Sequence, residues 1–196
     1  MTALNMELVL ASTSQHRKKL MERIGLPFRV VRPNCDENEA KKGCATPHAI
    51  ALHLSVIKAQ SVRSLEPSAT LIGSDQVVAI GSESFGKPGT PENAAKQLEL
   101  LSGRTHEVLT GLAVIHGMET FTHVEVARMA MRKLSRVQIE RYIERDLPLD
   151  CAGSYRLESS GIVLFDNISV RDHSSISGLP LLELTRILSH LGFQVP

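Results

Sequence analysis

One carboxylate stands where enzymes of the α/β class commonly carry out chemistry. Asp75 lies in the run Gly73-Ser74-Asp75-Gln76, directly after Ala69 to Ile72, an apolar stretch typical of a buried strand. Open α/β sheets bind ligands beyond the carboxyl ends of their strands, so we expect Asp75 at such an end. There a carboxylate can hold Mg²⁺ or accept a proton from an attacking water. Alternatively, Asp75 only starts a turn.

A candidate anion site lies near the amino terminus. Ser12 and Thr13 separate a strand-like stretch, Glu7 to Ala11, from a helix expected from Ser14 to about Ile24. The free amides and the dipole of a helix amino terminus favour phosphate, and Arg17 in the first turn can reach the same place. Alternatively, the serines are ordinary helix caps and Arg17 is a solvated surface residue.

Two lysines and two carboxylates are further candidates. Lys87 lies in a rigid turn between a glycine and a proline, where its ammonium can point at a phosphate. Lys58 lies on the polar side of the helix expected over residues 46–65. Asp36 and Glu37 are adjacent in a polar loop and offer further oxygen ligands for Mg²⁺. Each of these residues could instead serve only as a solvated surface group.

Several common sites are absent from the sequence. The eight histidines show no HxxxH or HxH spacing, and the three cysteines form no CxxC pair, which argues against zinc and against a disulfide framework. There is no P-loop, no GxGxxG and no GxSxG motif. The remaining possibility is that the scattered anion-binding and metal-binding groups converge in the fold.

The expected elements that must position these groups indicate a mixed α/β sheet flanked by helices. Strands and helices alternate in the first half, and a hairpin turning at Gly117 occupies the middle. The expected strands span 7–11, 28–31, 69–72 (extended on through 77–80), 107–116, 121–134 and 162–165. The expected helices span 14–24, 46–65, 90–103, 135–144 and 181–191, and loops are expected at 34–39 and 151–161.

Composition limits the class of protein. The chain has 196 residues, 42% of them apolar, which suits one domain or a compact domain with a small lobe. A net charge of +1 and an aromatic content of 4% without tryptophan give no indication of a nucleic acid or membrane partner. The segment from Met1 to Met6 lacks the pattern of a secretion signal, so we expect a cytoplasmic protein.

In order, these pieces resemble the Maf family of nucleoside triphosphate pyrophosphatases over nearly the whole chain. The matching runs are Leu10-Ala11-Ser12-Thr13-Ser14 with Arg17, Asp36-Glu37, Lys58-Ala59, Gly73-Ser74-Asp75-Gln76-Val77, Gly86-Lys87-Pro88, Cys151-Ala152-Gly153-Ser154-Tyr155 and Gly178-Leu179-Pro180. The resemblance implies an elongated α/β fold related to inosine triphosphate pyrophosphatases, with residues 1–196 forming one domain whose two lobes flank an active-site cleft. It also implies a homodimer.

The resemblance implies hydrolysis of a nucleoside triphosphate at the α–β phosphoanhydride with a divalent metal cation, Mg²⁺ or Mn²⁺. Asp75 would be the proton acceptor and, with Glu37, would assist the metal. The phosphates would be held by Ser12, Arg17, Lys58 and Lys87. Such an arrangement makes physical sense, because phosphoryl transfer requires mainly positioning and positive charge along a negatively charged transition state.

Within the family, Gly-Ser-Asp-Gln-Val and Cys-Ala-Gly-Ser are similar to the branch that hydrolyses 7-methyl-GTP. The comparison assigns specificity to His16, Gln76 and Glu158. A carboxylate at 158 suits the N1 and N2 hydrogens of guanine, and a ring at 16 suits a cationic methylated base, although relatives carry tryptophan there. The alternatives are dTTP, UTP or CTP as substrate, or a nucleotide-binding regulator of cell division in which hydrolysis is incidental.

Overall fold

The computed structural model describes residues 7–195, which form two compact units. The first unit comprises the chain up to Gln76, residues 110–125, and the chain from Asp172 onward. The second comprises residues 77–109 and 126–171. That residues 1–196 act as one domain stays a prediction, and Met1 to Met6, on which the expectation about targeting rests, lie outside the described residues.

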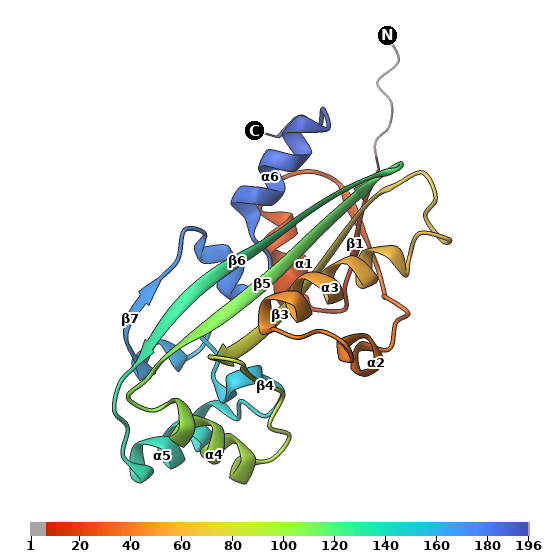
Figure 1. The fold of residues 1–196 in the computed structure, drawn as a ribbon. Coiled ribbons are helices and arrows are strands. Elements are labelled where there is room, and N and C mark those ends of the chain that lie inside the picture. The colour runs from red at the N-terminus through yellow and green to blue at the C-terminus, as the bar shows by residue number, and fades with distance from the viewer. Residues whose placement is uncertain (1–6, 196) are drawn as a thin grey trace. The chain divides into compact units, whose positions relative to one another are not determined.

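A mixed sheet with flanking helices forms the fold, as the sequence predicts (Figure 1). Its strands are β1 (Leu8–Ala11), β2 (Phe28–Val31), β3 (Thr70–Ile80), β4 (Glu83–Phe85), β5 (Thr105–His116), β6 (Glu119–Met131) and β7 (Phe165–Ser169). The helices are α1 (Gln15–Glu22), α2 (Glu37–Lys41), α3 (Pro47–Gln60), α4 (Pro91–Leu101), α5 (Arg136–Asp146) and α6 (Leu181–His190). Three short 3-10 helices span Ala152–Ser154, Gly161–Leu164 and His173–Ser177.

The strand order is β2-β1-β3-β5-β6-β7, with β4 paired to β3. Strand β1 pairs in parallel with both β2 and β3, whereas β4 and β7 pair antiparallel with β3 and β6. The strands β3, β5 and β6 contribute residues to both units. Among the described residues, no helix is both long enough and apolar enough to cross a membrane.

In the first unit, alternate side chains of β1 face two separate apolar cores. Leu8 and Leu10 pack with side chains of α1 and α6, while Val9 and Ala11 pack with side chains of α3 and the turn after it. Successive residues of a strand point to opposite faces, so a fully apolar strand predicts helices on both faces. Figure 1 shows α3 and the α1–α6 pair on either side of this part of the sheet.

Three expectations about local structure are wrong. Residues 37–39, expected as part of a loop, belong to α2, because the Asp36 carboxylate accepts hydrogen bonds from the amides of Asn38 and Glu39 and caps a helix. Residues 162–164, expected as strand, belong to the 3-10 helix Gly161–Leu164, and the strand begins only at Phe165. Asp75 is inside β3 and not at its end, because β3 continues to Ile80.

In the second unit, α4 and α5 pack together beside a small aromatic cluster. His106 is 1% exposed, and its Nε2 lies 2.9 Å from the hydroxyl of Tyr155. The rings of Tyr155 and Phe165 lie 5.6 and 5.9 Å from its own. Burial lowers the pKa of His106 from 6.5 to about 4, so the ring is neutral at physiological pH.

Replacing His106 with glutamine is expected to flatten the pH dependence of stability between pH 6.5 and 4. In the native chain the unfolded state takes up a proton below pH 6.5 and the folded state does not, so stability is complete above pH 6.5 and falls with the pH. The change in pKa corresponds to about 3 kcal/mol in total. Urea unfolding at several pH values measures the slope, with exposed His48→Gln as the matched control; an unchanged slope in His106→Gln contradicts the assignment.

Candidate active site

Two glycines bring α3 unusually close to the sheet. A Cβ atom added at Gly73 would lie 2.1 Å from the carbonyl oxygen of Ser55, and one added at Gly111 would lie 2.1 Å from that of Ala51. Neither position therefore tolerates a side chain without moving the helix backbone. This close approach holds Lys58, near the end of α3, against β3.

The buried centre of the first unit is an ion cluster built on Lys58. Its Nζ lies 2.5 Å from Oδ1 of Asp75 and 2.9 Å from Oε1 of Glu37. The Lys58 and Asp75 side chains are only 7% and 11% exposed, whereas Glu37 at the start of α2 is half exposed. A buried charge persists only when it is paired, so each member of the cluster depends on the others.

Asp75 lies in the middle of β3 but beyond the end of the neighbouring strand β1. The neighbouring strand β1 ends at Ala11, whose register partner on β3 is Gly73. Asp75 therefore lies two residues beyond the carboxyl end of β1, where the chain turns toward α1. Asp75 therefore lies near the end of a strand, but the strand that ends there is β1 and not β3.

Electrostatics around Glu37 favour its charged form. Burial acts to raise the pKa of this carboxyl, but the hydrogen bond and the charge of Lys58 outweigh it, with help from Lys41 and Arg17. The net result is a pKa below the ordinary value for glutamate. Glu37 is thus an acceptor and a candidate metal ligand over the whole physiological pH range.

Arg17 is fixed by the segment that precedes α6. Its Nε donates to the carbonyl oxygen of Gly178 over 2.8 Å, and the Ser74 hydroxyl lies 2.8 Å from the same oxygen. Burial lowers the pKa of Arg17, while the charges of Asp75 and Glu37 act in the opposite direction. The guanidinium is a permanent cation in this environment, and its two amino groups form a fork suited to phosphate.

Ser12 belongs to the turn between β1 and α1. It is 3% exposed, and its hydroxyl accepts a hydrogen bond from the amide of Ser14 over 3.1 Å. Ser14 in turn caps α1 by accepting from the amide of Arg17. The structure therefore gives both serines a local structural role, and binding of phosphate by Ser12 stays a prediction.

Gln76 is anchored through its amide nitrogen. Nε2 lies within hydrogen-bond distance of the carbonyl oxygens of Ser175 and Ile176, at 3.0 and 2.9 Å, and of the Thr110 hydroxyl, at 3.1 Å. The Thr110 hydroxyl itself donates to the Ser175 carbonyl. Gln76 thus connects β3 to the segment that holds Arg17.

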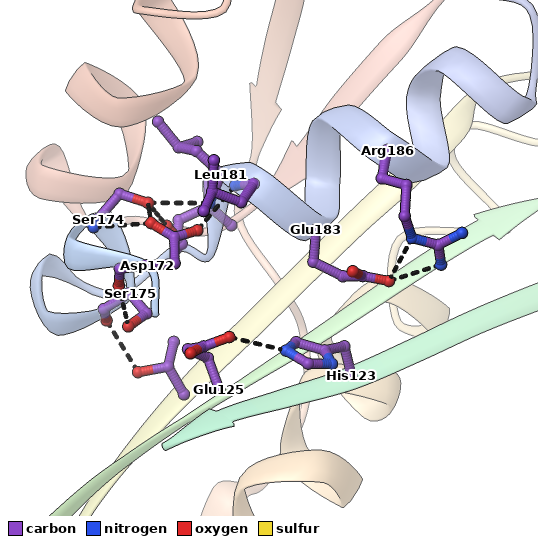
Figure 2. A network of polar contacts seen from close by, with 11 residues as sticks. His123, Glu125, Asp172, Ser174, Ser175, Leu181, Glu183 and Arg186 are labelled. Carbon is purple, nitrogen blue, oxygen red and sulfur yellow. Dashed lines mark hydrogen bonds and ion pairs between the residues drawn. The ribbon is translucent and has the colours of Figure 1, made fainter. Parts of the chain in front are cut away.

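A buried carboxylate that the sequence reading missed organises this segment. Asp172 is 4% exposed, and it accepts hydrogen bonds from the backbone amides of Ser174 and Leu182 (Figure 2). The Ser174 hydroxyl accepts from the amide of Leu181. Together they satisfy the first amides of α6. Asp172 also caps the 3-10 helix His173–Ser177 at the amide of Ser174, and only this local contact has the spacing of a capping pattern in the sequence.

The remaining predicted residues lie apart in the chain. His16 is exposed in the first turn of α1, within the first unit. Lys87, just after β4, and Glu158, in a turn, are exposed residues of the second unit. Their parts in phosphate binding and base recognition stay predictions. The structure brings together Arg17, Glu37, Lys58, Asp75 and Gln76 in one unit.

Solved structures similar in fold to this chain include two HAM1 proteins. A Ham1 protein from Staphylococcus aureus superposes with a TM-score of 0.54 at 17% identity, over 94% of this chain and 99% of that one. A HAM1 protein from Coxiella burnetii gives a TM-score of 0.52 at 16% identity, over the same shares of the two chains. At this level of identity the likeness concerns the fold alone.

The sequence comparison decides the family. A family model described as Maf-like protein matches residues 7–191. The chain belongs to the Maf family. Among the Maf relatives similar to it are proteins named 7-methyl-GTP pyrophosphatase from Bdellovibrio bacteriovorus, Xanthomonas axonopodis and Bordetella pertussis, at 40%, 41% and 42% identity. The matches cover 94%, 96% and 98% of this chain and 96%, 98% and 96% of those proteins.

Proposed function

We propose that this Maf protein hydrolyses 7-methyl-GTP at the α–β phosphoanhydride and releases the nucleoside monophosphate and pyrophosphate. The observation that carries the proposal is the buried Lys58–Asp75 pair with Glu37 beside it, in a chain similar over nearly its full length to 7-methyl-GTP pyrophosphatases. A carboxylate and an ammonium are the proton acceptor and the phosphate counter-charge that this reaction requires.

Each of the predicted catalytic and phosphate-binding residues has a part in the proposed reaction. Asp75 accepts the proton of the attacking water. Arg17, with Nε held by Gly178, presents its amino groups to the phosphates, and Lys58 supplies a second positive charge. These cations are already oriented before substrate binds, which is the condition under which electrostatic stabilisation is most effective. Ser12 and Lys87 complete the proposed phosphate contacts.

The carboxylates suit a divalent cation, Mg²⁺ or Mn²⁺. Oxygens of Asp75 and Glu37 converge on the single nitrogen of Lys58, so positive charge is already accommodated between them. In the part of the chain that the structure describes, no group of three or more histidine, cysteine or acidic side chains could hold a metal. Two carboxylates suffice for Mg²⁺, which takes its other ligands from water and substrate phosphates. When bound, the ion neutralises negative charge on the phosphates.

Base recognition is assigned to His16, Gln76 and Glu158. Because the amide nitrogen of Gln76 is held by the 175–176 carbonyls, recognition by Gln76 would use its amide oxygen, an acceptor. Glu158 is likewise an acceptor, and guanine offers N1 and N2 hydrogens to such groups. The homodimer remains part of the proposal on the strength of the family resemblance, and the cytoplasmic location remains a prediction from the sequence.

Pyrophosphate release from 7-methyl-GTP, GTP, dTTP, UTP, CTP and ITP, each with Mg²⁺ or Mn²⁺, tests the substrate. We expect a marked preference for 7-methyl-GTP and loss of turnover when the metal is chelated. Preference for a pyrimidine nucleotide would keep the chemistry and overturn the assignment of Gln76 and Glu158. Release from none of the six would favour a nucleotide-binding regulator.

A further inference from the structure

In the second unit, the four-residue segment that carries Lys87 is held at three backbone atoms. The carbonyl oxygen of Gly86 accepts from Nε2 of Gln97 over 3.0 Å, and that of Pro88 accepts from Nδ2 of Asn93 over 3.1 Å. The amide of Gly89 donates to the carbonyl oxygen of Leu149 over 2.9 Å. Both side-chain donors come from α4, so the helix fixes the backbone on each side of Lys87.

The amide group of Gln97 is fixed in one orientation. Its Oε1 accepts a hydrogen bond from the Ser154 hydroxyl over 2.7 Å, which directs Nε2 toward Gly86. Ser154 is fully buried and has a left-handed backbone with φ of 62°. A non-glycine residue adopts this conformation only where the surrounding structure enforces it.

The residue before Ser154 is equally constrained. Gly153 has φ of 75°, and a Cβ atom there would lie 2.9 Å from Cγ1 of Val78. The run Cys151-Ala152-Gly153-Ser154 thus places one hydroxyl against Gln97 at the expense of backbone strain. Strained residues of this kind cluster at functional sites, and here the contacts lead to Lys87.

We propose that Gln97, oriented by Ser154, is a positioning residue for Lys87, and that it sets the affinity of the Lys87 ammonium for a phosphate of the nucleoside triphosphate. The inference rests on the proposed function. Lysine has a long, flexible side chain, and a contact made by such a group costs less entropy when its backbone is already fixed. Gln97 touches no reacting group, so its effect passes through Lys87.

The alternative is that Gln97 only stabilises the second unit. A purely structural role would lower the unfolding temperature and would act on the chain whether or not residue 87 is a lysine. A positioning role acts on KM, and its effect disappears once the lysine is gone. A double-mutant cycle separates the two.

The experiment compares Gln97→Met, Lys87→Met and the double variant in 7-methyl-GTP hydrolysis, with exposed Lys96→Met on α4 as the control for a lost positive charge. We expect Gln97→Met to raise KM roughly three- to tenfold with little change in kcat, as for the loss of one hydrogen bond. In the Lys87→Met background the same change should have no further effect on KM. Lys96→Met should match the native chain.

A full Gln97→Met effect in the Lys87→Met background would overturn the inference, and so would a Lys87→Met variant with native KM. In both outcomes the proposed hydrolysis of 7-methyl-GTP stands, because the native chain still turns over this substrate, but a native KM in Lys87→Met would remove Lys87 from the proposed phosphate contacts. Failure of the proposed function is a different result, namely no pyrophosphate release by the native chain.

Discussion

Replacement of Asp75 by asparagine is expected to lower kcat for 7-methyl-GTP by about a thousandfold, the size of effect typical of a lost general base. Asparagine has nearly the same shape but cannot take up the proton of the attacking water. Lys58 retains Glu37 as an ion partner, 2.9 Å away, so the fold is expected to survive. Steady-state pyrophosphate release measures kcat, and equilibrium binding of a non-hydrolysable analogue should remain within severalfold of the native chain.

The matched control is Asp166→Asn, which makes the same chemical change at an exposed position of β7 in the second unit. It should leave kcat unchanged. If Asp75→Asn retained more than about a tenth of native kcat, the assignment of the proton acceptor would be wrong. If it lost binding together with turnover, Asp75 would serve binding in place of proton transfer.

Replacement of Lys58 by methionine is expected to lower kcat/KM by about a hundredfold and to destabilise the fold by about 3 kcal/mol. Methionine fills a similar volume but leaves the Asp75 carboxylate, only 11% exposed, without its ammonium partner. The phosphates lose one cation at the same time. Urea unfolding measures the stability, and pyrophosphate release measures kcat/KM.

Exposed Lys19→Met on α1 controls for the general loss of one positive charge and should change neither quantity. Loss of stability with native kcat/KM would make the ion cluster purely structural. Native stability would show that the Asp75 carboxylate does not need Lys58.

Much of the fold follows from the sequence because its local signals agree with the tertiary structure. Three local patterns each predict one element: the apolar run around Leu8 and Leu10 predicts a strand, the proline at the start of α3 predicts a helix, and Gly117 predicts a hairpin turn. The structure differs from the prediction where one capping side chain or one strand partner determines the local structure. Asp36 converts an expected loop into α2 by capping it, and β3 runs past Asp75 because β4 gives its far end a partner.

The candidate site was only partly predictable. Local spacing and the family resemblance pointed to Asp75, Lys58 and Glu37, but their convergence depends on how closely α3 approaches the sheet. Gly73 and Gly111 permit that approach. The contacts of these glycines with α3 join residues far apart in the sequence, so no short-range sequence pattern predicts them. Asp172 and Gln97 act through hydrogen bonds to backbone atoms. Such bonds do not depend on the side chain of the partner residue, so they are harder still to predict from the sequence.

The most direct test of the central claim is identification of both products when the native chain and Asp75→Asn are incubated with 7-methyl-GTP and Mg²⁺. We predict equal amounts of 7-methyl-GMP and pyrophosphate from the native chain and almost none from the variant. Release of 7-methyl-GDP and inorganic phosphate, or equal turnover by the variant, would contradict the account.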